Sequence, residues 1–312
     1  MVYNKRLYNT PFGGRTMKKL KIANLSPTPL MIVLAVGVFL SVPIRVFQLC
    51  NCVDSATGFW AAKDFTIILL YIICGVVGAL AFFLSFFSGI MTKPKFKEGK
   101  DLALGICGGI FAATLLLDTV QLVLKFIGLM SSYTTDNNGR LSYYMTTSGG
   151  FAIVLSALFG ALGTAYLTFV SISAISGTNK YSHKRILGLG PVLWAMFRLV
   201  YHFTDPINYR NISQLYLEIL MLCFAMIFFL SFARIASEIN EGSSMMILWF
   251  SGVCTALLAY ICALAPFILV ITGKGELLPS AYPMRYCDLG LAAFITAFLF
   301  TVTPLTNEVG EN

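Results

Sequence analysis

The sequence predicts an all-α protein, a polytopic membrane helical bundle with about eight transmembrane helices. Of its 312 residues 57% are hydrophobic and only 12% are charged, whereas soluble domains are about 25% charged. Apolar runs of about 20 residues, long enough to span a bilayer as a helix, recur along the chain with short polar connections. No polar stretch is long enough to fold as a separate soluble domain.

The apolar runs define eight predicted spans, of which the fifth and the eighth are the shortest. The spans are residues 28–49, 65–91, 102–130, 150–175, 186–203, 213–233, 244–272 and 287–304. They make one transmembrane domain over residues 28–304. A basic segment, 1–27, precedes it, and a short tail, 305–312, follows it.

The first apolar run also resembles a signal peptide, because basic residues precede it. It is longer than the apolar core of a signal peptide, and no small-residue cleavage site follows it. We therefore expect an uncleaved first span. Met17, followed by Lys18 and Lys19, is a plausible start in its own right.

The distribution of Lys and Arg predicts the orientation of the spans. With both termini on the same side, 14 of the 22 basic residues fall in that side's segments and 5 in the opposite loops. Cytoplasmic segments carry the excess of basic residues, so both termini are predicted to be cytoplasmic, in a multi-pass protein of the cell (plasma) membrane. This topology accounts for the net charge of +8, and no nucleic-acid partner is predicted.

Small residues in the third and fourth spans predict close helix packing. Gly105 and Gly109 are four residues apart, as are Ser156, Gly160 and Thr164. Such spacing lets two helix backbones approach each other. Packing within the chain is the simpler interpretation, and a dimer interface is the alternative.

Two similar pentamers raise the possibility of a 4+4 parallel internal repeat. Residues 82–86 and 228–232 both read Phe-Phe-Leu-Ser-Phe, and the span before each carries an arginine, Arg45 or Arg198. Four spans per half would give both halves the same orientation. Chance recurrence of Phe and Leu in membrane helices is the alternative.

Ionisable residues inside apolar spans are the candidate functional residues, since each costs roughly 2.5–3.5 kcal/mol at a helix centre. In the third span Asp118, Gln121 and Lys125 follow a helical spacing and are predicted to share one face. Asp118 is the deepest, and its side chain is too short to reach the membrane surface.

The other ionisable residues lie in the first, fifth and sixth spans. Arg45 and Gln48 share one face of the first span, and Arg198 and His202 share one face of the fifth. Because Arg198 and His202 cannot neutralise each other, Glu218 in the sixth span is the predicted partner.

All these residues fall in the outer half of the membrane on the predicted topology, which suggests one polar cavity open to the outside. Counting Arg45, Lys125 and Arg198 against Asp118 and Glu218 leaves one positive charge, suited to a small anionic or zwitterionic solute. The alternative is that the long basic side chains extend to the membrane surface and bind nothing.

Most of the eight cysteines lie in apolar spans and are expected to pack as small hydrophobic residues. Cys50, Cys52 and Cys287 fall near the outer face, where a disulfide from Cys50 or Cys52 to Cys287 would tie the first span to the last. No cysteine lies near a histidine in a metal-site spacing, so no metal site is predicted.

Several short motifs carry a resemblance. They are Arg45-x-x-Gln48, Asp54-x-x-Thr57-Gly58-Phe59, Trp194 to Arg198, Asn211-Ile212-Ser213, Glu218 and Phe232-Ala233-Arg234. With these motifs the chain resembles uncharacterised multi-span integral membrane proteins of Gram-positive anaerobic bacteria. The resemblance brings no activity with it, and it implies that Arg45, Gln48, Asp54, Arg198 and Glu218 form a family pattern.

No catalytic or cofactor motif is present, so we predict neither an enzyme nor a cofactor. A small-solute or ion transporter-like protein in contact with the lipid bilayer is the first hypothesis. A membrane receptor or an accessory or scaffold subunit, with no transport activity, is the second. An intramembrane enzyme would need an acid–base pair such as His202 with Glu218.

Overall fold

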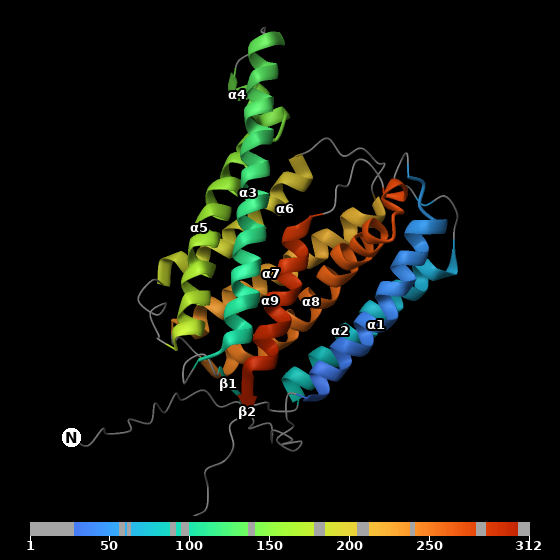
Figure 1. The fold of residues 1–312 in the computed structure, drawn as a ribbon, viewed down its shortest axis with the longest axis vertical. Helices are drawn as coiled ribbons and strands as arrows, with labels where there is room; N and C mark the ends of the chain where they lie inside the picture. Colours follow the sequence, from blue (N-terminus) through green and yellow to red (C-terminus); the bar gives the residue numbers. More distant parts are fainter. Residues whose placement is uncertain are drawn as a thin grey trace, which may run out of the picture.

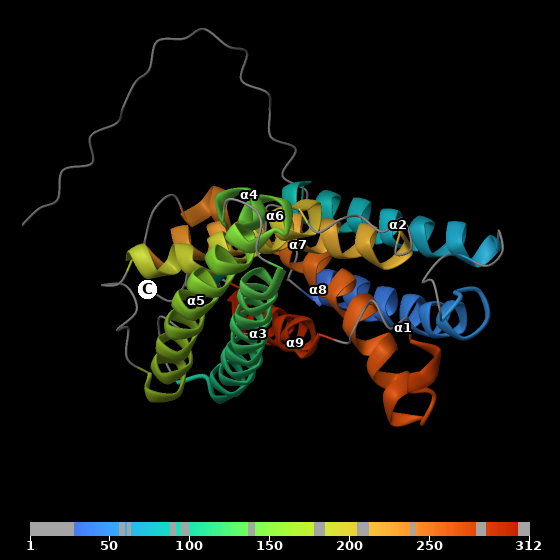
Figure 2. The ribbon, with the colours of Figure 1, turned by 90° about the horizontal axis from the view of Figure 1, so that it is seen from above.

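The computed structural model describes residues 28–55, 60, 64–87, 92–94, 100–136, 141–177, 185–204, 212–237, 241–278 and 285–304. The predicted N-terminal segment and C-terminal tail lie outside these residues. Figures 1 and 2 show the arrangement of the helices in two perpendicular views.

The described part of the chain is helical apart from one short strand pair. The helices are α1 (Thr28–Asn51), α2 (Phe65–Phe87), α3 (Leu102–Asp136), α4 (Leu141–Thr147), α5 (Gly150–Ser176), α6 (Gly190–Thr204), α7 (Ile212–Ala236), α8 (Glu241–Ile271) and α9 (Tyr286–Thr301). Short 3-10 helices, Arg185–Leu189 and Gly275–Leu277, precede α6 and follow α8.

The all-α membrane bundle is confirmed. Seven of the described helical segments are long and apolar enough to cross a membrane. The fifth, Ile186–Thr204, reaches this length because the 3-10 helix before α6 continues directly into α6. The eighth predicted span corresponds to α9, an apolar helix of only 16 residues. The sequence did not predict α4 or the extension of α3 to Asp136.

The bundle is arranged around α7 and α8. On one side α3 packs against α5 and α9, and α5 packs against α6, which in turn contacts α7. On the other side α1 and α2 pack against each other and against α8. The upper end of α3, together with α4, rises beyond the ends of the other helices (Figure 1).

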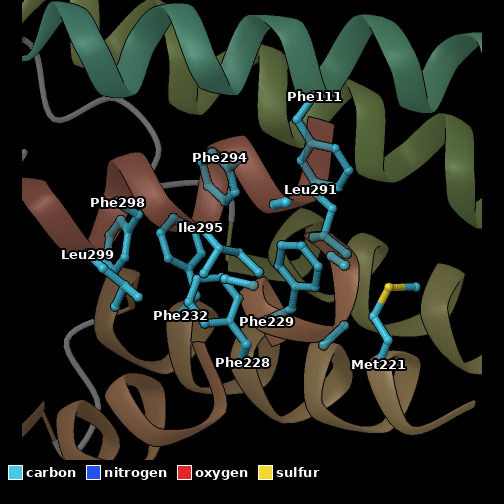
Figure 3. Packing of buried hydrophobic residues seen from close by; sticks show 14 of the residues in the cluster. Phe111, Met221, Phe228, Phe229, Phe232, Leu291, Phe294, Ile295, Phe298 and Leu299 are labelled. Atoms are coloured by element: carbon cyan, nitrogen blue, oxygen red, sulfur yellow. The ribbon is translucent and has the colours of Figure 1, made fainter. Parts of the chain in front are cut away.

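An aromatic core joins α3, α7 and α9 (Figure 3). Phe111 and Phe294 stack with ring centroids 5.7 Å apart, and Phe232 meets Phe298 edge to face at 5.2 Å. Such pairs add about 0.5–1.5 kcal/mol to the free energy gained by burying the rings. They hold the short α9 against two longer helices.

Two short strands bring distant segments of the chain together. β1 (Thr92–Pro94) follows α2, and β2 (Val302–Pro304) follows α9; they pair antiparallel. The end of α9 therefore lies on the same side of the bundle as the connection after α2, which agrees with an even number of spans. Which side faces the cytoplasm stays a prediction from the basic residues.

The small residues of the third and fourth spans pack within the chain, with one exception. A Cβ at Gly105 would lie 2.3 Å from Ile175 Cγ1 in α5, and one at Gly160 would lie 2.5 Å from Thr119 Oγ1 in α3. A Cβ at Gly109 would meet no atom within 4 Å. Gly105 and Gly160 thus let α3 and α5 approach closely, whereas Gly109 does not.

The packing gives no support to the predicted 4+4 repeat. In the second half α7 packs extensively on α8, but the corresponding helices α2 and α3 make no comparable contact among the described residues. The pentamers also differ in environment: Phe82 is 41% exposed, whereas Phe228 is fully buried. The two identical pentamers, residues 82–86 and 228–232, therefore lie in different environments in the bundle.

The closest backbone approach predicts a sensitive position at the start of α6. A Cβ at Gly190 would lie 2.8 Å from the backbone nitrogen of Gly163 in α5, where no side chain can move aside. Gly190→Ala should therefore destabilise the protein by about 1–3 kcal/mol, the usual cost of overpacking. Thermal unfolding in detergent measures the effect.

Gly75→Ala is the matched control, because a Cβ at Gly75 meets no atom within 4 Å. Alanine favours the helix over glycine, so this variant should unfold at the same temperature or slightly higher. Equal unfolding temperatures for the two variants would contradict the close contact of α5 with α6.

Candidate functional site

The centre of the candidate site is Arg198 of α6, which is only 2% exposed. Its Nη1 donates to Asp288 Oδ1 at 2.6 Å, and its Nη2 donates to Asp288 Oδ2 at 2.8 Å. This bidentate geometry matches the planar guanidinium to the planar carboxylate. Nη2 also donates a short hydrogen bond to Glu218 Oε1 of α7, so the predicted pairing with Glu218 is present.

Glu218 joins Arg198 to two further groups. Its Oε1 lies 3.1 Å from His202 Nε2 and 3.3 Å from Arg285 Nη1. The His202 contact is an ion pair only when the imidazole is protonated, and its geometry is not that of a hydrogen bond. Arg198, His202, Glu218, Arg285 and Asp288 together form what we term the Arg198 network.

Helix geometry explains how three helices supply this network. Trp194, Arg198 and His202 are one turn apart on α6, and all three are buried. Asp288 lies in the first turn of α9, and Arg285 immediately precedes that helix. The partners therefore meet only because α9 packs back into the bundle.

Asp118 lies beside the network and is buried, as predicted. Its carboxylate interacts electrostatically with Arg198 and with Cys287. Contacts of Gly290 in α9 with Phe111 and Thr114 in α3 bring this part of α3 alongside α9.

Several polar atoms around Asp118 and Arg198 are buried without a hydrogen-bond partner. They include Asp118 Oδ2, Arg198 Nε and Trp194 Nε1. Trp194 and Thr119, the residue after Asp118, both lie against Gly160 of α5, so these atoms come from neighbouring parts of α3 and α6. Buried donors and acceptors without partners are rare in proteins, so these atoms are available to hydrogen-bond a water molecule or a ligand.

Gln121 and Lys125, which the sequence placed in the same polar cavity, do not join the Arg198 network, and both side chains are exposed. This part of α3 continues past the start of α9, so Asp288 of α9 does not reach these two residues. Lys125 Nζ instead makes a short hydrogen bond with the Tyr201 hydroxyl and lies 4.7 Å from the centre of that ring.

Arg45 forms a second, separate site between α1 and α7, and it is fully buried. Its Nη1 donates to Gln48 Oε1 at 3.2 Å, and its Nη2 donates to Gln214 Oε1 at 2.7 Å. In the part of the chain that the structure describes, no carboxylate forms an ion pair with Arg45, and its Nε has no hydrogen-bond partner.

The amide groups around Arg45 are held in turn by backbone oxygens. Gln48 Nε2 donates to Thr66 O at 2.8 Å, and Gln214 Nε2 donates to Cys262 O at 3.2 Å. Burial of Arg45 and Arg198 inside the protein argues against the alternative that they reach the membrane surface. The single predicted cavity is thus two networks, joined by α7, on which Gln214 and Glu218 are one turn apart.

Sequence reasoning missed Asp288, Arg285 and Gln214. Arg285 falls in a predicted outer loop, and Asp288 is the second residue of the eighth predicted span, 287–304, where an acid looks like the end of that loop. The sequence did contain one signal: Asp288 lies at the start of an apolar run and follows Arg285 by three residues. Gln214 carries no charge, and no sequence signal distinguished it.

The disulfide predicted from Cys50 or Cys52 to Cys287 is not present, and all three thiols are free. Cys287 is buried in the bundle beside Asp118. The Cys52 thiol instead donates to Asp64 Oδ2 at 3.0 Å, and Asp64 Oδ1 accepts from the backbone nitrogen of Thr66 at the start of α2.

Comparison of the chain with models of protein families, with curated proteins and with solved structures gave no match. The resemblance to multi-span proteins of Gram-positive anaerobic bacteria therefore stays a prediction. Arguments about function rest on the two networks themselves.

The Arg198 network predicts a large cost for removing its central cation. Arg198→Met would leave the buried Asp288 without its bidentate partner, and breaking a buried pair costs about 3–5 kcal/mol. Adding Asp288→Leu should recover part of this loss, because the unpaired charge is then removed. Chemical unfolding of both single variants and the double variant measures the coupling; additive losses would contradict a direct pair.

The Cys52–Asp64 contact predicts a pH effect outside the spans. Burial, and then the hydrogen bond to the Asp64 carboxylate, raises the pKa of the Cys52 thiol. The same bond holds the pKa of Asp64 below its usual range. Alkylation requires the thiolate, so reaction of Cys52 should begin at a higher pH than for a free cysteine.

Asp64→Asn removes the carboxylate, so the pH midpoint of Cys52 alkylation should fall. Peptide mass spectrometry after timed alkylation measures Cys52 and Cys50 in the same sample. Cys50, two residues earlier, should keep the same profile in both proteins. An unchanged midpoint for Cys52 would show that Asp64 does not act on this thiol.

Proposed function

We propose that the protein is transporter-like and moves a small solute or ion, with Asp118 and the Arg198 network as its binding or coupling site. The observation that carries this proposal is the meeting of ionisable side chains from α3, α6, α7 and α9 in the buried core. Ionisable groups inside a membrane are expensive, and chains of Asp, Glu and His serve as proton relays in pumps and transporters.

The charge of the site favours a proton, a cation or a zwitterion, whereas the sequence predicted an anionic or zwitterionic solute. Arg198 and Arg285 stand against Asp118, Glu218 and Asp288, which leaves one negative charge while His202 is neutral. Protonation of His202 would bring the sum to zero.

Glu218 is the group that links the binding of a proton or cation to the contact between α6 and α7. The bidentate bond of Arg198 to Asp288 does not involve Glu218. A proton or a cationic group that neutralises Glu218 would weaken its bonds to Arg198 and Arg285, and α7 would be released from α6. Asp118, with its unpartnered oxygen, supplies a second acceptor close by. We assign no catalytic step to this arrangement.

The second candidate is a receptor or an accessory or scaffold subunit without transport activity. The observation that favours it is the close internal pairing of Arg198 with two carboxylates. In some proteins, ion pairs of this kind have a purely structural role and fix the positions of helices.

Flux through proteoliposomes distinguishes the two candidates. Asp118→Asn and Glu218→Gln should each lower proton or solute flux at least about tenfold, which corresponds to 1.4 kcal/mol in the barrier. A pH-sensitive dye inside the vesicles measures proton flux, and release of a trapped amino-acid mixture measures solute flux.

Glu276→Gln is the matched control, because Glu276 is exposed in the 3-10 turn after α8. This variant should keep the flux of the unmodified protein. Folded Asp118→Asn and Glu218→Gln proteins with unchanged flux would refute the transport proposal and favour the scaffold.

A further inference from the structure

A groove of about 780 Å³ opens between α2 on one side and α7 and α8 on the other. Its volume lies within the range of about 300–1,000 Å³ that is usual for ligand sites. Gly75 and Gly78 of α2 form much of one wall, and Leu220, Leu257 and Leu258 contribute to the other. The groove is separate from the Arg198 network, and its role does not depend on the function proposed above.

Aromatic pairs close both ends of the groove. At one end Tyr71 of α2 meets Tyr216 of α7 edge to face, with centroids 5.9 Å apart. At the other end Phe82 of α2 meets Phe250 of α8 at 5.6 Å, and Phe224 of α7 meets Phe250 at 5.7 Å. The rise from Tyr71 to Phe82 along α2 is roughly 16 Å at 1.5 Å per residue, a length suited to an extended acyl chain.

The two ends differ in polarity. Only the tyrosine end carries hydroxyl groups, and it lies next to the buried Arg45. Tyr71 interacts electrostatically with Arg45. Tyr216 follows by two residues Gln214, which accepts the hydrogen bond from Arg45. The phenylalanine end is apolar.

Among the described residues, no carboxylate forms an ion pair with Arg45, which lies near this end of the groove. Its described partners are two amide oxygens and the ring of Trp60, 5.5 Å from its guanidinium carbon. Its Nε is buried without a hydrogen-bond partner. A positive charge near one end of an apolar groove roughly 16 Å long, at 1.5 Å per residue, is complementary to an amphiphile with an anionic headgroup.

We propose that this groove holds one acyl chain of an anionic phospholipid from the bilayer, with the phosphate of the lipid near Tyr71, Tyr216 and Arg45. The lipid enters sideways from the leaflet that contains this end of α2. Bound there, it fills the space between α2 and α7, and its charge compensates Arg45.

The groove offers a test that leaves the fold intact. Gly75→Leu places a side chain into the groove, where a Cβ meets no atom within 4 Å. Gly109→Leu is the matched control, because Gly109 of α3 is equally free of neighbours but lies outside the groove. Both changes replace a helical glycine with a residue that favours the helix.

Native mass spectrometry of the delipidated protein, titrated with phosphatidylglycerol or phosphatidylcholine, measures binding. The unmodified protein and Gly109→Leu should bind phosphatidylglycerol roughly fivefold more tightly than phosphatidylcholine, the factor expected for one favourable contact between a basic residue and an anionic lipid. Gly75→Leu should lose this tighter binding.

Two results would overturn the proposal. Tight binding of phosphatidylglycerol that persists in Gly75→Leu would place the lipid elsewhere on the protein. Equal affinity of the unmodified protein for the two lipids would remove the role of Arg45 and of the anionic headgroup. Thermal unfolding of Gly75→Leu without lipid verifies that the variant is folded.

Discussion

The arrangement of α6, α7 and α9 depends on the compensation of one buried cation, the guanidinium of Arg198. A charged group inside a protein is costly unless other charges and hydrogen bonds satisfy it. Asp288 supplies a bidentate bond from α9, and Glu218 supplies another bond from α7. The short α9 is therefore held at its first turn by charge and along its length by the aromatic core of Phe294 and Phe298.

The two buried arginines, Arg45 and Arg198, have different kinds of hydrogen-bond partner. Arg198 faces carboxylates, whereas the described partners of Arg45 are amide oxygens. Helix α7 contributes to both sites, because Gln214 and Glu218 lie one turn apart. A change in the charge of Glu218 would thus act on a helix that also positions the partner of Arg45. This shared helix gives a physical route between the proposed solute site and the proposed lipid site.

The bilayer explains features that would be unfavourable in water. Helix α2 is mostly uncovered by protein, and side chains such as Phe83 and Ile68 are exposed. In a membrane these side chains contact lipid, and the backbone is satisfied within the helix. Helices α1 and α2 are peripheral: they pack mainly on α8 and meet α7 through the Arg45–Gln214 and Tyr71–Tyr216 contacts. This position also leaves room for the groove beside α7.

The sequence by itself determined the class of protein and seven of the spans, together with the shorter apolar helix α9, because length and hydropathy are local properties. It also predicted the burial of Arg45, Asp118, Arg198 and Glu218 from their places in apolar runs. It also pointed to the pairing of Arg198 with Glu218 by elimination of like charges. Only the tertiary structure decided that Asp288 and Arg285 complete the network and that Arg45 stands apart from it. It also decided that Lys125 is exposed. The physical reason is that periodicity states which residues share a face of one helix, whereas the packing between helices decides what that face meets.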